Sequence, residues 1–118
     1  MSDLNLEEQL RSAYPTLFDD SWCEVGVGEG WHQLVKTLCG VIDNRRKFAS
    51  TKVDVKVRQI KEKFGGLRFY IDGGDDGIWG AIALAEELSL HMCEECGAPG
   101  KQVSPRGWIK TKCEEHAK

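Results

Sequence analysis

Two short pairs of metal-binding residues near the C-terminal end constrain this chain more than any other feature. Cys93 and Cys96 form a C-E-E-C pair, and after sixteen intervening residues Cys113 and His116 form a C-E-E-H pair. Each pair brings two ligands to one side of a tight turn, and two such turns complete a tetrahedral zinc site. Four protein ligands leave no open position, so the spacing predicts a structural Zn2+ rather than a catalytic one. His91, beside the first pair, is the one substitute ligand that we consider.

The length of the chain favours a single domain. At 118 residues it is near the size at which one hydrophobic core can be sustained. We expect residues 1–92 to form an α+β core and residues 93–118 to form a zinc ribbon that is integral to the same domain. The five cysteines fit a metal site in a reducing cytosol better than a disulfide framework, so Cys23 and Cys39 are expected to be buried thiols. We find no apolar run of membrane-spanning length and no secretion signal, and expect a cytoplasmic protein.

The net charge of −3 is unevenly distributed along the chain. Residues 44–68 carry nine basic and two acidic side chains, whereas residues 1–43 carry a net −6 and residues 69–118 a net −4. The basic block therefore lies between two acidic flanks. It either neutralises these flanks within the fold or binds an anionic partner.

Apolar residues recur every three or four positions in three stretches, which predicts three helices. These helices are expected at about residues 4–13, 30–48 and 78–92. Ser2 or Asp3 is the expected N-cap of the first helix, and Asp75 with Asp76 favours the start of the third. The third helix is expected to continue directly into the first ligand pair.

Two glycine-rich stretches resemble ligand-binding loops but lack the residues that such loops need. V-G-V-G-E-G, residues 25–30, is not followed by the Lys-Ser/Thr of a phosphate-binding loop, so we interpret it as a hinge into the second helix. D-G-G-D-D-G, residues 72–77, would place Gly74 at the third position of a calcium loop and Ala83 at the twelfth, where a Glu is required. We therefore interpret the second stretch as a turn.

Alternating apolar and polar residues predict a β-hairpin in the middle of the chain. Its strands cover about residues 53–58 and 67–72, joined by a turn at Gly65-Gly66, with a bulge near Ile60 where the alternation breaks. One face of this hairpin is expected to cover the helices. The order of elements predicts an α+β fold of helices packed on a β-hairpin, followed by a small C-terminal zinc ribbon or knuckle.

Four segments in the C-terminal half together resemble a known group of proteins. They are residues 60–73, 85–89, 93–100 and 106–117. The combination of a K-E-K-F-G-G-L-R-F-Y hairpin with a C-terminal C-x-x-C and C-x-x-H resembles an uncharacterised family of small proteins of bacteria, prophages and phages. The resemblance supports one metal site at the four ligands named above, and it draws attention to Lys61, Lys63, Phe64, Gly65, Arg68, Tyr70 and Trp108. It implies no established activity, but it suggests action on a host protein or a host defence system.

We consider three classes of function. The first is a non-enzymatic, zinc-stabilised interaction protein, in which Trp79 and Trp108 could serve as binding residues. The alternative is nucleic-acid or nucleotide binding through residues 44–68, with bases stacked on Phe69 and Tyr70. An enzyme is not expected, because it needs an open metal position or a second cluster of histidines and carboxylates.

We expect a host protein as the partner, with nucleic acid or a nucleotide as the alternative, and no membrane. The candidate partner-binding residues lie on the outward face of the hairpin and in the ribbon. They are Lys56, Arg58, Arg68, Tyr70, Arg106 and Trp108. The sequence does not indicate an oligomeric state.

Overall fold

The computed structural model describes residues 5–19 and 23–117 and has the predicted α+β fold. Its elements in chain order are α1 (Leu6–Ala13), β1 (Glu24–Gly26), α2 (His32–Phe48), β2 (Val55–Lys63), β3 (Gly66–Gly73), α3 (Asp76–Ser89), β4 (Lys101–Val103) and β5 (Lys110–Lys112). Single 3-10 turns at Glu29–Trp31 and Pro105–Gly107 precede α2 and connect β4 to β5. None of the helices in this described part is long and apolar enough to cross a membrane.

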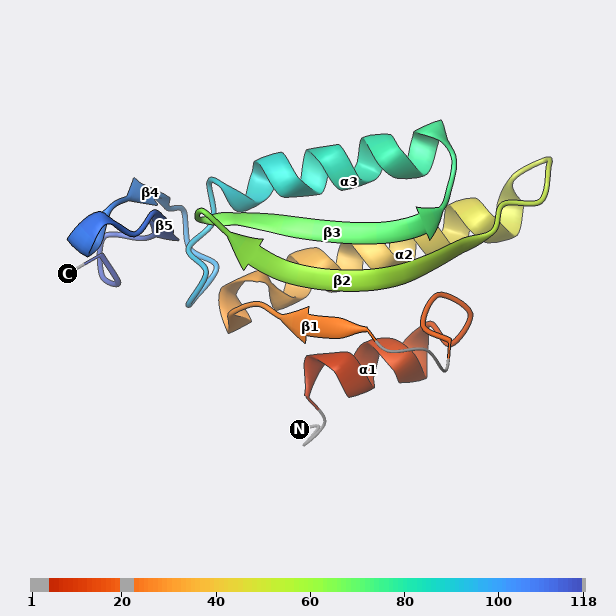
Figure 1. Cartoon of the computed structure of the whole chain (residues 1–118), viewed down its shortest axis with the longest axis horizontal. Coiled ribbons are helices and arrows are strands. Elements are labelled where there is room, and N and C mark those ends of the chain that lie inside the picture. The colour runs from red at the N-terminus through yellow and green to blue at the C-terminus, as the bar shows by residue number, and fades with distance from the viewer. Residues whose placement is uncertain (1–4, 20–22, 118) are drawn as a thin grey trace.

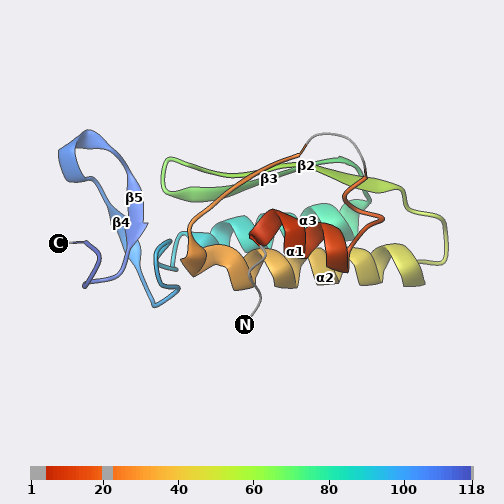
Figure 2. The same cartoon turned by 90° about the horizontal axis from the view of Figure 1, so that it is seen from below.

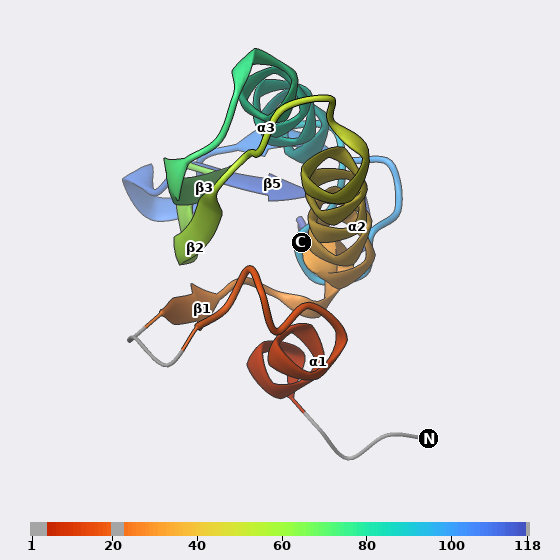
Figure 3. The same cartoon turned by 90° about the vertical axis from the view of Figure 1, so that its right-hand side faces the viewer.

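The strands form two small sheets, and the helices lie on one side of the larger one (Figures 1, 2 and 3). In the larger sheet the central strand β2 pairs antiparallel with β3 and parallel with β1. The sequence did not predict β1, which occupies the start of the supposed hinge. β4 and β5 form an antiparallel ribbon at one end of the molecule (Figure 1).

The helix starts follow local capping chemistry. The side chain of Asn5 accepts a hydrogen bond of 2.8 Å from the amide of Glu8 and caps α1. The caps predicted for this helix, Ser2 and Asp3, lie outside the described residues. Asp75 caps α3 as predicted, because its carboxylate accepts a hydrogen bond of 3.0 Å from the Ile78 amide.

α3 ends earlier than its apolar spacing predicts. The helix stops at Ser89, and Met92 forms an isolated β-bridge with Pro99 instead of a further helical turn. The buried Ser89 hydroxyl accepts a hydrogen bond of 2.9 Å from the Leu67 amide and donates one to the Glu86 carbonyl. This contact satisfies the Leu67 amide on the outer edge of β3, as the Glu86 carboxylate does for the Phe69 amide, which explains why a polar residue lies in the core.

The hairpin has the expected strands but a different turn. Phe64 and Gly65 form a two-residue loop with positive φ angles of 54° and 81°, so the turn lies one residue earlier than Gly65-Gly66. The bulge also occurs earlier than predicted, at Arg58 between two paired residues. Because the bulge shifts the alternation by one residue, Ile60 points into the core.

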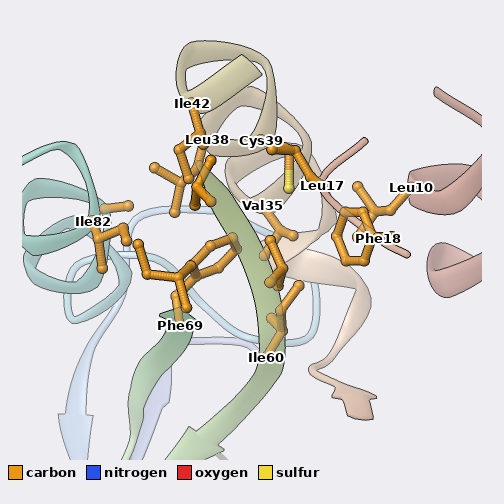
Figure 4. Packing of buried hydrophobic residues seen from close by; sticks show 14 of the residues in the cluster. Leu10, Leu17, Phe18, Val35, Leu38, Cys39, Ile42, Ile60, Phe69 and Ile82 are labelled. Carbon is orange, nitrogen blue, oxygen red and sulfur yellow. The ribbon is translucent and has the colours of Figure 1, made fainter. Parts of the chain in front are cut away.

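The hydrophobic core lies between the larger sheet and the helices (Figure 4). Its largest fully buried side chains are Trp31 and Phe69, and each such residue stabilises the fold by ~1.5–3 kcal/mol. Cys23 and Cys39 are buried free thiols, as predicted. Burial raises the pKa of both thiols, so they behave as small apolar side chains.

Candidate metal centre

The four predicted ligands come together at the end of the molecule that carries the β4–β5 ribbon. Their ligand atoms all lie within 4.8 Å of one another. The Sγ atoms of Cys96 and Cys113 are 3.7 Å apart, and the Nδ1 atom of His116 is 3.5 Å from Cys93 Sγ and 3.2 Å from Cys113 Sγ. A tetrahedron with metal–ligand bonds of ~2.3 Å to sulfur and ~2.0 Å to nitrogen has edges of ~3.8 and ~3.5 Å. The cluster therefore has the right dimensions to bind a metal ion through three sulfurs and one nitrogen.

Tight turns place each pair of ligands. The first pair follows α3, where the Cys93 carbonyl accepts a hydrogen bond of 2.8 Å from the Gly97 amide. Gly97 has a φ of +82°, a conformation that glycine adopts without steric cost. The second pair follows β5, where the Cys113 carbonyl accepts a hydrogen bond of 2.9 Å from the Ala117 amide. A hydrogen bond of 3.1 Å from the Glu94 amide to the carbonyl of Thr111 joins the first turn to β5.

Backbone dipoles around the sulfurs favour thiolates, the form that binds metal. Burial raises the pKa of the Cys93 thiol, but the amides of Cys113, Cys96 and Glu95 point at its sulfur and lower the pKa to about 6. The His116 amide likewise lowers the pKa of Cys113. Hydrogen bonds to Cys113 and then Cys93 raise the pKa of the His116 imidazole. The hydrogen bond from the Ala98 amide lowers the pKa of Cys96, but desolvation and the neighbouring Cys113 and Cys93 side chains outweigh it, so this pKa is raised instead. Two of the three thiols, Cys93 and Cys113, thus favour the thiolate form in the absence of an ion.

The glycine-rich stretch before α2 holds the first metal turn against the core. The Gly30 amide donates a hydrogen bond of 2.7 Å to the Glu94 carbonyl, and the Gly28 amide donates one of 3.1 Å to the Glu94 carboxylate. A Cβ atom on Gly30 would lie 2.1 Å from the Cys93 carbonyl oxygen and 2.5 Å from the Gly97 nitrogen. Gly30 is therefore required for close backbone contact with the metal turn, a role that the interpretation as a hinge missed.

The tip of the β2–β3 hairpin lies against the other side of the ribbon. The buried Thr111 hydroxyl donates a hydrogen bond of 2.5 Å to the Gly65 carbonyl, and Lys110 forms an ion pair of 3.2 Å with Glu62. The side chain of Gln102 also reaches the Phe64 carbonyl, at 3.4 Å. The ribbon therefore contacts the core through both the glycine-rich stretch and the hairpin tip.

The candidate partner-binding residues of the hairpin do not form one uniform basic face. Lys56 donates a hydrogen bond of 2.7 Å to the Thr16 carbonyl, and Arg58 pairs with Asp72 at 2.6 Å and with Asp19. Both basic residues lie at the end of the hairpin far from its tip. Arg68 and Tyr70 lie nearer the tip, where the Tyr70 side chain is exposed.

The two candidates in the ribbon occupy the loop between β4 and β5. Trp108 is 74% exposed, and Arg106 adopts a φ of +54° in the 3-10 turn. Trp79, on α3, is also exposed at 48%. The structure thus distributes the six candidate residues over the far end of the hairpin, its tip region and the ribbon, with no single cluster.

Comparison with known proteins identifies no relative. No family model matches the chain, and neither the curated proteins nor the solved structures include a match. The resemblance to a family of small bacterial and phage proteins stays a prediction.

Proposed function

We propose that this protein is a non-enzymatic interaction protein, stabilised by a structural Zn2+, that binds another protein through the tip of its β2–β3 hairpin. The donor set of three cysteines and one histidine is typical of structural zinc, and it completes a tetrahedron without leaving a position for substrate. In the setting that the family resemblance suggests, the partner is a host protein or part of a host defence system. We define the hairpin-tip surface as Lys61, Lys63, Phe64, Arg68 and Tyr70.

Phe64 is the observation that carries this proposal. Its side chain is 64% exposed, and its backbone has a φ of +54°. Bulky residues rarely adopt this conformation, and two-residue hairpin turns favour Asn, Asp or Gly there. Neither the exposed side chain nor the positive φ of Phe64 stabilises the fold. The positive φ alone costs on the order of 1 kcal/mol. An exposed aromatic side chain in a strained turn is well suited to be an anchor in a protein interface.

Basic side chains without a carboxylate partner lie near this anchor, and Lys63 Nζ is 5.5 Å from the centroid of the Phe64 ring. Five of the nine basic residues in the 44–68 block form ion pairs within the chain. They are Arg45, Arg46, Lys47, Lys52 and Arg58. Within the described part of the chain, no carboxylate pairs with Lys61, Lys63 or Arg68. Lys61 and Arg68 lie directly opposite each other on neighbouring strands, an arrangement that destabilises a sheet unless an anion lies nearby.

The metal-bound ribbon gives the tip a fixed position. Three residues of the ribbon contact the hairpin, namely Thr111, Lys110 and Gln102. A preorganised tip loses less conformational entropy on binding than a free loop, which favours affinity. In this proposal the zinc acts on binding indirectly, by positioning Phe64.

Nucleic-acid binding is the alternative function, because the same three cations could contact phosphates. A protein partner is favoured over it because five of the nine cations in residues 44–68 are already paired with carboxylates of the described chain, and Glu114 and Glu115 are exposed on the ribbon. Nucleic-acid affinity would fall steeply with salt, since each neutralised phosphate releases a counterion. For an acidic protein partner, added salt would mainly lower the rate of association.

Capture from a lysate of the native host, with and without nuclease, tests this function. The informative variant is Phe64→Asn, because Asn tolerates a positive φ and the variant should remain folded. The matched control is Phe48→Asn, which removes an aromatic side chain that is 81% exposed at the end of α2. We expect Phe64→Asn to lose nuclease-resistant partner proteins that the wild type and the control retain. Retention of every partner by Phe64→Asn would contradict the proposal, and loss of all partners after nuclease would favour the alternative.

A further inference from the structure

A pocket beside Phe64 is formed where three parts of the chain meet. Its lining comes from the hairpin tip, from the second half of α3 with its C-cap Leu90, and from the ribbon. Figure 1 shows these three parts next to one another at the end of the molecule that carries the ribbon. The pocket has a volume of about 370 Å³, which is within the range of pockets that bind ligands.

The charged residues of the lining are separated according to the element that carries them. Lys63 and Arg68 come from the hairpin, Glu86 and Glu87 come from α3, and the described residues of the ribbon add no further charge to the lining. Within the part of the chain that the structure describes, none of these four residues forms an ion pair, either across the pocket or elsewhere. The pocket therefore has a positive side and a negative side that do not neutralise each other by direct contact.

Contacts of the core fix the position of the two sides. The Glu86 carboxylate accepts a hydrogen bond of 3.0 Å from the Phe69 amide, which holds α3 beside β3. A Cβ atom on Gly66 would lie 3.2 Å from Leu90 Cδ2 and 4.0 Å from Arg68 Nη1. The absence of a side chain at Gly66 therefore leaves room between the Arg68 guanidinium and Leu90.

Apolar side chains line the rest of the pocket and connect it to the proposed interface. Ile109 of the ribbon is 41% exposed, and Phe64 lines the same pocket. Lys63 Nζ lies 5.5 Å from the centroid of the Phe64 ring. The positive side of the pocket and the aromatic anchor thus form one continuous surface, so a protein bound at Phe64 also covers the pocket.

We infer that the pocket binds a segment of the protein partner in which an acidic and a basic side chain lie close to an apolar one. This inference rests on the proposed function, in which the hairpin tip binds a protein. The acidic side chain pairs with Arg68 and Lys63, because a guanidinium matches a carboxylate with two parallel hydrogen bonds. The basic side chain pairs with Glu87, and the apolar side chain packs against Leu90 and Ile109.

Occupants that carry charge of one sign match only one side of the pocket. A nucleic-acid strand or a wholly acidic segment would bring negative charge beside Glu86 and Glu87. A wholly basic segment would bring positive charge beside Lys63 and Arg68. Like charges that face each other across an interface suppress binding, whereas complementary charges select the partner. A segment with both charges therefore fits all four charged residues of the lining.

Selection from a library of random dodecapeptides displayed on phage, with the immobilised zinc-loaded full chain as bait, tests the chemistry of the occupant. We expect the enriched peptides to combine an acidic, an apolar and a basic residue within a few positions. Enrichment of peptides with charge of one sign, or of none at all, would overturn the inference.

Neutral variants then test the two sides of the pocket with the most enriched peptide. Arg68→Gln and Glu87→Gln should each raise the Kd of the peptide about fivefold at low salt, because each removes one ion pair. Lys36→Gln on α2 and Glu8→Gln on α1 are the matched controls, since they remove the same charges outside the pocket lining. The controls should change the Kd at most about twofold. Circular dichroism and zinc content should be the same in all five proteins.

A double-mutant cycle assigns each charge of the peptide to one side. When the acidic residue of the peptide is replaced by its amide, Arg68→Gln should no longer change the Kd, whereas Glu87→Gln should keep its effect. Replacement of the basic residue by an uncharged one should give the opposite result. Effects of the two variants that do not depend on the charges of the peptide would refute the assigned contacts.

The outcome can be separated from that of the proposed function. Capture from the host lysate that depends on Phe64, together with peptides of one charge sign, would overturn this inference and leave the proposed function in place. Capture that does not depend on Phe64 would instead contradict the proposed function, and the inference with it.

Discussion

Replacing Gly30 by alanine tests whether the metal turn depends on the core. The new Cβ would lie 2.1 Å from the Cys93 carbonyl oxygen, 2.5 Å from the Gly97 nitrogen and 2.7 Å from the Cys96 nitrogen. All three atoms belong to the backbone of the metal turn, so no side-chain rotation can relieve the overlap. The turn and α2 must move apart, and the hydrogen bond of 2.7 Å from the Gly30 amide to the Glu94 carbonyl would be lost.

Two terms set the size of the effect. Overpacking of this kind costs ~1–3 kcal/mol, and a lost backbone hydrogen bond adds ~1 kcal/mol. We therefore expect Gly30→Ala to lower the free energy of unfolding of the zinc-loaded protein by about 2–4 kcal/mol. If the strain falls on the metal turn instead, the same free energy corresponds to a zinc Kd raised roughly 30- to 1000-fold.

The neighbouring glycines provide the controls for this experiment. At Gly26, no described atom lies within 4 Å of the position that a Cβ would occupy, so Gly26→Ala should leave both stability and zinc affinity nearly unchanged. Gly28→Ala should behave like Gly30→Ala, because its Cβ would lie 2.5 Å from the Glu94 carbonyl oxygen. Urea unfolding and zinc competition with a chromogenic chelator measure the two quantities. If the free energies of unfolding of Gly30→Ala and Gly26→Ala agreed within about 0.5 kcal/mol, the reasoning would be refuted, since ordinary surface substitutions fall in that range.

Three further predictions concern the metal, the sheet edge and a helix cap. Elemental analysis of protein purified without added metal should find about one zinc per chain, and Cys113→Ser should lose it. Ser89→Ala should lower the free energy of unfolding in urea by ~1–3 kcal/mol, because a β3 amide loses its acceptor, whereas Ser50→Ala, outside the buried core, should not. The hydrogen bond from the Ile78 amide, followed by Arg45, lowers the pKa of Asp75. Its contribution is therefore complete above about pH 4 and lost as the pH falls through the lower folded pKa, so urea titrations of wild type and Asp75→Ala should converge in acid.

The metal ligands could be predicted because their geometry is local. Two residues between Cys93 and Cys96, and two between Cys113 and His116, fit a single tight turn in each case. The contact of Gly30 with the first turn could not be predicted, because it joins residues more than sixty positions apart in the chain. A glycine-rich stretch without phosphate-loop partners was its only signal.

The end of α3 shows where apolar spacing fails. Leu88 continues the helical stripe of Ile78, Ile82 and Ala85, yet it is 43% exposed while Ser89 is fully buried. The edge of β3 needs a hydrogen-bond acceptor, and the buried hydroxyl supplies it. Periodicity measures only hydrophobicity, so it cannot detect a position at which a polar contact decides burial. The same limit applies to Leu88, which the spacing assigns to the core although it is exposed.

The basic block shows the corresponding limit for charge. The sequence indicates that residues 44–68 are basic, but the partners of Arg45 and Arg58 come from Asp75, Asp72 and Asp19, in the acidic flanks. Neutralisation within the fold therefore accounts for part of the block, while Lys61, Lys63 and Arg68 have no carboxylate partner among the described residues. Only the three-dimensional pairing separates the neutralised residues from those left at the hairpin tip.

The two functions proposed for the ribbon, metal binding and positioning of the hairpin tip, depend on each other. The turn of the first ligand pair contacts Gly30, and the strand β5 carries Thr111, whose hydroxyl donates a hydrogen bond to the Gly65 carbonyl. In the proposed function, metal binding orders both. A strained Phe64 turn next to Gly65 is maintained only if the surrounding structure compensates for its cost. Removal of zinc should therefore release the Phe64 turn as well as the ribbon, even though Phe64 is not a ligand. Two hydrogen-bonded contacts thus link the candidate metal site to the exposed Phe64 turn, which is the arrangement that the proposed function requires.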